Sequence, residues 1–250
     1  MSRHDEPSTA RAPRATGGLL AHFSARQDPF TSALQVFPLF LIYQIGILMQ
    51  GGRGHNGVDF LTRTLIELCA RDLDHYLLTL ASLFVAYGCL LLILRPRGRF
   101  RSESFIPVLL ESVFYATTMG TLILCVMQWA QELVPTLAIG SLSSVDVIVI
   151  SAGAGLHEEL VFRLIGMAGL GWLLTGVTGP RRAWLLALVG SSLLFSVAHH
   201  VGPGFEAFSF TAFVYRALAG AFFGLVYHLR GFSVAAWTHA LYDVYVLTLA

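Results

Sequence analysis

Long apolar stretches, separated by short polar ones, run along most of the chain. They cover roughly residues 33–50, 76–94, 105–130, 145–175, 183–200, 208–228 and 232–250. A bilayer core of about 30 Å is crossed by a helix of about 20 residues. The pattern therefore predicts an all-α fold, a polytopic transmembrane bundle of about seven helices.

A different pattern lies between the first two apolar stretches, in Val58–His75. Phe60 and Leu65 belong to a set of apolar residues at helical spacing, interleaved with charged residues such as Arg63 and Glu67. Such alternation is typical of an amphipathic helix lying on the membrane interface. A short helix in water is the alternative interpretation.

The polar and apolar parts of the chain also predict its domain organisation. Residues 1–30 are polar, and no apolar stretch with a small-residue cleavage site follows them closely enough to be a secretory signal. We interpret residues 1–30 as a disordered cytoplasmic tail, and residues 31–250 as a single transmembrane domain without internal repeats.

Composition agrees with a membrane protein. The chain is 55% hydrophobic and 12% charged, whereas soluble domains carry about 25% charged residues. The basic residues are dispersed, so no nucleic-acid partner is indicated. Cys69, Cys89 and Cys125 form no CxxC pair, which argues against a disulfide framework and against a thiolate zinc site.

The arginines predict an orientation, because positive charge accumulates in cytoplasmic segments. With the N-terminus inside, the outside segments hold only Arg53, Arg63 and Arg71, while the inside segments hold most of the others. All basic residues other than histidine are arginine, which is typical of a bacterial chain. We therefore expect a multi-pass protein of the bacterial inner (plasma) membrane with a cytoplasmic N-terminus.

Ionisable residues inside the apolar stretches are the candidates for function, because each costs at least about 2.5–3.5 kcal/mol on insertion. Glu158 and Glu159 are adjacent in the fourth stretch, on helix faces about 100° apart. Arg163 follows Glu159 by four residues, so the two can pair on one face. Glu158 is left pointing elsewhere, as suits a general base or acid.

Two later stretches carry further candidates. His199 lies at the end of the fifth stretch, and His239 and Asp243 share a face of the seventh at i, i+4 spacing. If the fourth stretch protrudes beyond the membrane on its cytoplasmic side, Glu158 lies about 14 Å below that surface and His239 about 13 Å, at 1.5 Å per residue. His199 is as far from the turn between the fourth and fifth stretches as Glu158, so all three groups can meet at one depth.

Structural explanations compete with these functional ones. A single buried histidine is more often a hydrogen-bonded structural residue, and we favour that role for His157, His200 and His228. The Glu159–Arg163 pair could serve helix packing alone. A purely structural origin is harder to accept for three polar groups on three helices at one depth.

The ordered motifs resemble a known family. Glu158-Glu159-x-x-x-Arg163, then Phe195-x-x-x-His199, then His239-x-x-x-Asp243 are similar to those of the CPBP intramembrane proteases. This family, also called Abi, includes CAAX prenyl protease 2 and proteins like lysostaphin resistance protein A. The resemblance covers about residues 145–245 and implies a helical membrane fold with a cavity open to the bilayer.

The resemblance also implies roles for individual residues. Glu158 would activate water with help from His199, Glu159 and Arg163 would support them, and His239 with residue 243 would stabilise the oxyanion. Family members often have Asn at that last position, so Asp243 is a departure. An ionised Asp cannot donate a hydrogen bond, so Asp243 would have to be protonated or act by orienting His239.

No cofactor is required by this chemistry, although zinc is the alternative. Glu158, His199 and His239 are the candidate ligands, and zinc would lower the pKa of a bound water to about 7. The HExxH motif of zinc proteases is not formed, because Val161 stands where its second histidine belongs. We favour the metal-free mechanism.

The function expected from these residues is that of an intramembrane endopeptidase. Its partners would be the lipid bilayer and a membrane-anchored or lipidated protein or peptide, cut near its C-terminus. A proton-coupled transporter using the same residues is one alternative, although no inverted repeat supports it. A haem protein with histidine ligands and a catalytically inert member of the family are the others.

Overall fold

The computed structural model describes residues 26–50, 67–69, 72–129, 142–201 and 208–249, and all regular structure within these ranges is helical. The elements are α2 (Pro29–Met49), α4 (Leu73–Leu94), η1 (Arg95–Arg97), η2 (Ser102–Ser104), α5 (Phe105–Trp129), α6 (Ser144–Gly153), η3 (Ala154–Met167), α7 (Ala168–Thr178), α8 (Pro180–Ala198), α9 (Phe210–Arg230) and α10 (Phe232–Leu249). The predicted all-α class is confirmed.

Six helical stretches of the described chain are long and apolar enough to cross a membrane. They are Pro29–Met49, Leu73–Arg97, Ser102–Trp129, Ser144–Thr178, Pro180–Ala198 and Phe210–Arg230. The prediction of a polytopic membrane bundle is therefore confirmed. The seventh predicted stretch does form a helix, α10, but it is not among the six, because polar residues such as His239 and Asp243 lower its hydropathy.

Two sequence predictions fall largely outside the described residues. The amphipathic helix expected over Val58–His75 overlaps them only at residues 67–69 and 72–75, and the last three of these belong to α4. The tail expected over residues 1–30 overlaps them from residue 26, and α2 already begins at Pro29.

The helix ends follow from local sequence. The side chain of Asp28 caps α2 by accepting a hydrogen bond from the backbone N–H of Thr31 at 2.9 Å, and Ser143 and Asp146 form a reciprocal capping box at the start of α6. The tight turns before α8 and α10 need residues with positive φ. Gly179 (φ 80°) and Gly231 (φ 100°) meet that need without steric cost.

The helices α6, η3 and α7 form one continuous membrane helix, Ser144–Thr178. Its middle third, η3, is a π-helix, in which backbone hydrogen bonds span five residues instead of four. Wide turns of this kind are rare and often mark functional sites. The π-helix contains Glu158, Glu159 and Arg163, all of them buried.

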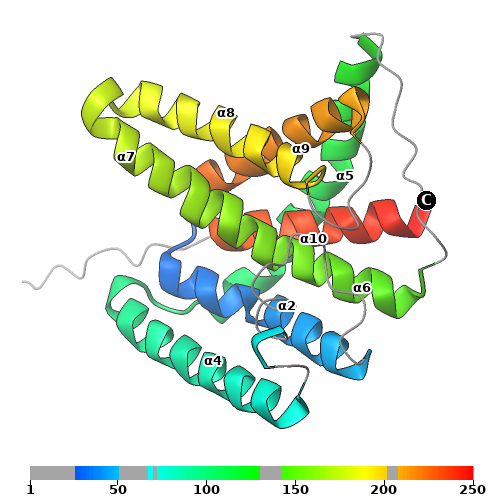
Figure 1. Cartoon of the computed structure of the whole chain (residues 1–250). Coiled ribbons are helices and arrows are strands. Elements are labelled where there is room, and N and C mark those ends of the chain that lie inside the picture. The colour runs from blue at the N-terminus through cyan, green and yellow to red at the C-terminus, as the bar shows by residue number, and fades with distance from the viewer. Residues whose placement is uncertain (1–25, 51–66, 70–71, 130–141, 202–207, 250) are drawn as a thin grey trace, which may run out of the picture.

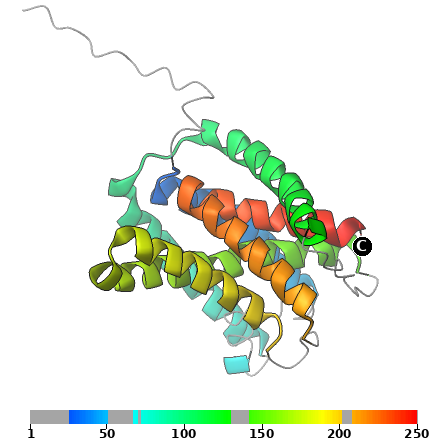
Figure 2. The same ribbon diagram turned by 90° about the horizontal axis from the view of Figure 1, so that it is seen from above.

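Helix α10 occupies the centre of the bundle. It packs against α2, α5, α6, η3 and α9, and Figure 1 shows it in red between the long α6–η3–α7 helix and α5. Seen from above, α7 and α8 lie on one side, α5 on the other, and α9 and α10 between them (Figure 2).

Helix α4 is the most peripheral element. Among its described neighbours it packs mainly on α2 and on η1, which continues it, and only Tyr76 and Leu80 of its residues are buried. The contact with α2 is an aromatic cluster in which Phe84 and Tyr87 of α4 meet Phe37 and Phe40 of α2. Most of the apolar surface of α4 is therefore available to lipid.

Candidate active site

Three polar side chains from separate helices converge in the interior of the bundle. Glu158 Oε2 of η3 lies 3.6 Å from His199 Nε2, just after α8, and 3.8 Å from His239 Nε2 of α10. Glu158 and His239 are buried. The convergence that the sequence predicted from helix depth is thus found, with both imidazoles directed at the same carboxylate oxygen.

Glu159 joins η3 to α10 by contacting one polar side chain on each of these helices. Its Oε1 lies 2.8 Å from His239 Nδ1, and its Oε2 lies 3.2 Å from Arg163 Nε. The i, i+4 pairing with Arg163 was predicted, but the hydrogen bond to His239 was not. Since all three side chains are buried, each needs these partners to offset the loss of hydration.

The hydrogen bonds define which imidazole nitrogens carry protons. His199 Nδ1 lies 2.8 Å from the carbonyl oxygen of Phe195, and a carbonyl can only accept, so Nδ1 is the donor. His239 Nδ1 donates to Glu159 in the same way. In a neutral ring, Nε2 is then a free acceptor. His239 can donate from Nε2 only as an imidazolium.

Asp243 lies on the side of His239 that faces Glu158. Its Oδ2 is 3.7 Å from His239 Nε2, while Nδ1 belongs to Glu159. The orienting role considered for Asp243 is therefore filled by Glu159. The side chain of Asp243 is 24% exposed and that of His199 is 22% exposed, whereas Glu158 is 2% exposed. The site is thus more open at Asp243 and His199 than at Glu158.

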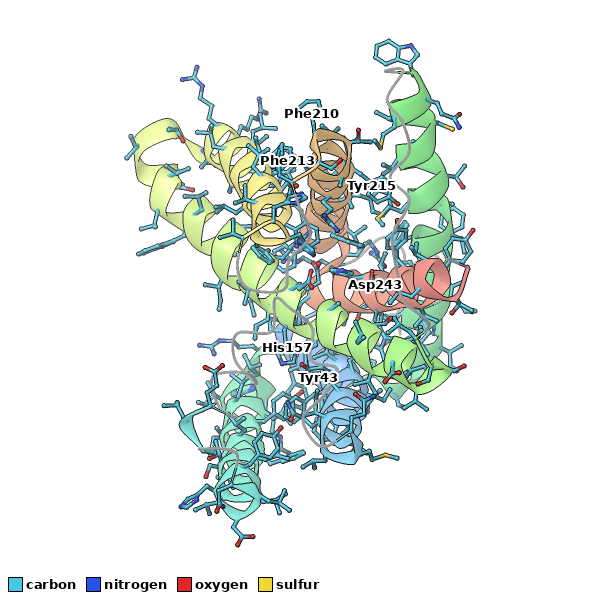
Figure 3. The ribbon with its side chains drawn as sticks, turned by 45° about the vertical axis from the view of Figure 1, so that its right-hand side comes forward. Tyr43, His157, Phe210, Phe213, Tyr215 and Asp243 are labelled. Atoms are coloured by element: carbon cyan, nitrogen blue, oxygen red, sulfur yellow. The ribbon has the colours of Figure 1, made fainter. Side chains whose placement is uncertain are left out.

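The open side borders α9. Figure 3 shows Asp243 on α10 and Tyr215 on the neighbouring α9, and the hydroxyl of Tyr215 contacts that of Tyr242, the residue before Asp243. Tyr215 was not among the predicted site residues. Tyr215 belongs to no motif or spacing pattern in the sequence that would have identified it.

Aromatic rings hold the charged groups in place. Phe223 of α9 stacks on the ring of His239, with centroids 4.2 Å apart and planes at 16°. The guanidinium carbon of Arg163 lies 4.5 Å from the ring centre of Phe195 and 5.5 Å from that of Phe223. These cation–π contacts, together with a hydrogen bond from Arg163 Nη2 to the Gly220 carbonyl at 3.1 Å, stabilise a buried guanidinium.

A glycine lets η3 and α10 approach closely enough to form the site. A Cβ atom at Gly155 would lie 2.5 Å from the Ala236 carbonyl oxygen and 2.8 Å from the Ala240 backbone nitrogen. Both are backbone atoms of α10, so they cannot move aside independently. The missing side chain at 155 therefore sets the distance between Glu158 and Glu159 on one helix and His239 on the other.

His157, His200 and His228 make packing contacts with aromatic side chains of neighbouring residues. His157 is buried, its Nδ1 lies 3.0 Å from the Gly153 carbonyl, and its ring packs on Tyr43 of α2 at 4.9 Å (Figure 3). His200 packs between Phe208 and Phe213, and His228 packs on Trp184.

A metal would need three or more donors arranged around one point. Among the residues that the structure describes, no group of three or more His, Cys, Asp and Glu side chains has an arrangement that could hold an ion. Glu158, His199 and His239, the zinc ligands considered from sequence, are not identified as such a group, and the metal-free mechanism stays a prediction.

Comparison with known proteins adds an independent finding. Residues 140–245 match the family model described as type II CAAX prenyl endopeptidase Rce1-like. The matched region begins just before α6 and ends within α10, so it includes every residue of the cluster around Glu158. No curated protein and no solved structure matches the chain.

Proposed function

We propose that the chain is a CAAX-type peptide hydrolase and that the cluster around Glu158 is its active site, since residues 140–245, which contain this cluster, match the Rce1-like family model. The substrate is a peptide bond of a membrane-anchored or lipidated protein or peptide, near its C-terminus. One observation carries this proposal: a buried carboxylate oxygen faces the Nε2 atoms of two histidines from different helices, at 3.6 and 3.8 Å.

Glu158 and His199 would activate the attacking water. The 3.6 Å between Glu158 Oε2 and His199 Nε2 is longer than a hydrogen bond, and a water can bridge such a separation. With Nδ1 donating to Phe195, the Nε2 of neutral His199 accepts a hydrogen bond from that water. Glu158 takes the proton as the water oxygen attacks the peptide carbonyl, and delivers it to the leaving amine nitrogen.

His239 and Asp243 would stabilise the oxyanion that this attack creates. Glu159 holds His239 by Nδ1, so His239 as an imidazolium presents its Nε2–H to the reacting carbonyl oxygen. Asp243 lies beside the same nitrogen and contributes a second donor when its carboxyl group is protonated. Glu159 and Arg163 act through His239 and are positioning residues.

The membrane setting of this reaction follows from the fold. The chain is a multi-pass membrane protein, and its partners are the bilayer and a protein substrate. We further propose that it lies in a bacterial inner membrane with a cytoplasmic N-terminus. In support, the starts of α2 and α10, the end of α4 and the α7–α8 turn, all close to arginines in sequence, lie along one edge of the bundle (Figure 1).

Cleavage of a candidate substrate by the purified protein in liposomes tests the proposal. Glu158→Gln and His199→Gln should each lower the turnover number by at least about 100-fold, the typical size of a general acid–base contribution. The matched controls are Glu103→Gln and His75→Gln, which alter exposed residues and should leave the turnover number unchanged. Full activity in Glu158→Gln would refute the assignment, and proton flux without cleavage would favour a transporter.

A further inference from the structure

A basic hollow lies at the end of α4, outside the region that matches the family model. Its volume is about 560 Å³. It is formed by the connection from α4 to α5 and by the residue that precedes α2. The residues that line it are Asp28, Arg95, Pro96, Gly98, Arg99 and Arg101.

The charge of this hollow is not balanced from within. Arg95, Arg99 and Arg101 are exposed, and no ion pair links any of them to the described part of the chain. Asp28 is the one acidic residue in the lining, and its carboxylate is already occupied. It accepts hydrogen bonds from the backbone N–H and the hydroxyl of Thr31, at 2.9 and 2.7 Å.

The backbone of the connection fixes the shape of the hollow. Gly98 lies so close to Asp28 that a Cβ atom at this position would be 1.7 Å from the Asp28 carboxylate oxygen. The Thr31 hydroxyl, whose proton points mainly to Asp28 at 2.7 Å, also lies 3.1 Å from the Arg99 carbonyl oxygen. The segment that carries the arginines is therefore held against the first turn of α2 by backbone contacts as well as by side-chain packing.

The position of the hollow indicates the source of its ligand. Arg95 follows directly on α4, whose last residues include the exposed Leu92 and Ile93, and the exposed Phe100 lies between Arg99 and Arg101. Charged and exposed apolar side chains thus alternate at the end of a membrane-spanning helix. Arginine binds phosphate through its planar set of donors, and basic pockets at helix ends are suited to anionic headgroups.

We propose that this hollow binds the phosphate of an anionic phospholipid headgroup, with the acyl chains along the exposed side of α4. Such a lipid would connect the end of α4 to the start of α2. This matters because only Tyr76 and Leu80 of α4 are buried, and its contacts with α2 are its main attachment to the described part of the bundle. The inference does not depend on the proteolytic function.

Native mass spectrometry of the purified full-length protein, titrated with phosphatidylglycerol, phosphatidylcholine or inorganic phosphate, tests the proposal. Phosphatidylglycerol should bind more tightly than phosphatidylcholine and should raise the melting temperature. Arg95→Gln/Arg99→Gln should weaken phosphatidylglycerol binding by at least about tenfold, because charge-assisted hydrogen bonds from two guanidinium groups to the phosphate are lost.

The matched control is Arg181→Gln/Arg182→Gln, two exposed arginines at the start of α8, which should change binding by less than about twofold. Equal weakening in both double variants would overturn the proposal, since it would show a general effect of surface charge. Equal binding of the two lipids by the unaltered protein would overturn it whether or not the variants fold. Binding of inorganic phosphate as strong as that of phosphatidylglycerol would identify a site for soluble phosphate instead.

Discussion

Glu159 Oε1 lies 2.8 Å from His239 Nδ1, although the two residues are 80 positions apart and lie on different helices. This hydrogen bond connects the π-helix to α10 in the centre of the bundle. It fixes the ring of His239 so that Nε2 faces Glu158. The carboxylate that pairs with Arg163 along its own helix thus also orients an imidazole of the proposed active site.

The two roles of Glu159 can be separated. In Glu159→Gln, the buried guanidinium of Arg163 loses its carboxylate, which should destabilise the fold by about 3–5 kcal/mol. In Glu159→Gln/Arg163→Met, both charges are gone, so most of the lost stability should be regained. Thermal unfolding in detergent measures this. Turnover should stay at least about 100-fold below the wild type, because His239 is still without its orienting carboxylate. Recovery of activity together with stability would contradict this role.

Asp243 should be replaceable by a residue that donates without titrating. Asparagine keeps a donor beside His239 Nε2 at every pH, so Asp243→Asn should retain activity. In the wild type, turnover should fall as the pH rises through the titrations of Asp243 and His239, and in Asp243→Asn only the decline due to His239 should remain. Asp243→Leu removes the donor and should lower the turnover number by about 100-fold or more. The test is to measure the turnover number as a function of pH for the wild type, Asp243→Asn and Asp243→Leu. Full activity in Asp243→Leu would exclude a hydrogen-bond donor role for Asp243.

Phe223 should influence catalysis without touching substrate. Its ring stacks on His239 and faces Arg163, contacts worth about 0.5–1.5 kcal/mol each. Phe223→Leu should therefore lower kcat by about tenfold and leave KM nearly unchanged. Phe114→Leu, the same change at an exposed position of α5, is the control and should have no effect. A change confined to KM would instead place Phe223 in substrate binding.

Two glycines in membrane helices should respond in opposite ways to the same substitution. Gly155→Ala places a methyl group against the backbone of α10, so it should lower both the melting temperature and the activity. Gly88→Ala in α4 meets no atom within 4 Å and should be neutral or stabilise by up to about 1 kcal/mol, since alanine is the better helix former. Melting curves of both variants provide the comparison, and an undisturbed Gly155→Ala protein would show that the contact does not limit the packing of η3 on α10.

Removal of metal ions should not abolish cleavage. In the proposed mechanism Glu158 is the base that activates the water, and the oxyanion is stabilised by His239 and Asp243, so no step uses a metal ion. Purified active protein treated with a strong zinc chelator and then dialysed should keep its turnover number. Loss of activity that returns on addition of zinc, at one ion per chain by metal analysis, would replace this mechanism with a metal-dependent one.

Much of the fold could be predicted from hydropathy alone, because membrane solvent imposes one requirement on every spanning segment. The six candidate spans correspond to six of the seven apolar stretches. Side-chain pairs within one helix were also predictable, because residues four positions apart lie on the same face of a regular helix. Glu159 with Arg163, and His239 with Asp243, follow from i, i+4 spacing.

Contacts between helices were harder to predict from the sequence. Depth arithmetic could bring Glu158, His199 and His239 to one level, but it could not show which carboxylate faces which nitrogen. The hydrogen bond from His239 to Glu159 depends on the rotation of α10, which sequence periodicity does not define in a helix buried on several sides. Phe223 gave no signal, because one phenylalanine in an apolar helix resembles any other.

The π-helix was also beyond sequence reasoning. Hydrophobic periodicity separates helix from strand, but Ala154–Glu159 is buried at every position, so no exposed face reveals the number of residues per turn. The sequence therefore predicted a continuous α-helix. The wider turns are stabilised by tertiary packing, such as the approach of Gly155 to α10, which is a property of the assembled bundle.

The central position of α10 has a consequence for synthesis. A growing chain that has inserted α6 to α9 holds Glu158 and His199 but not His239, so its oxyanion site is incomplete. Because α10 is more polar than the six candidate spans, the bundle that receives it must already be in place to satisfy His239 and Asp243. If the cluster around Glu158 is the active site, as proposed, the nascent chain is expected to acquire peptidase activity only when α10 has joined the bundle.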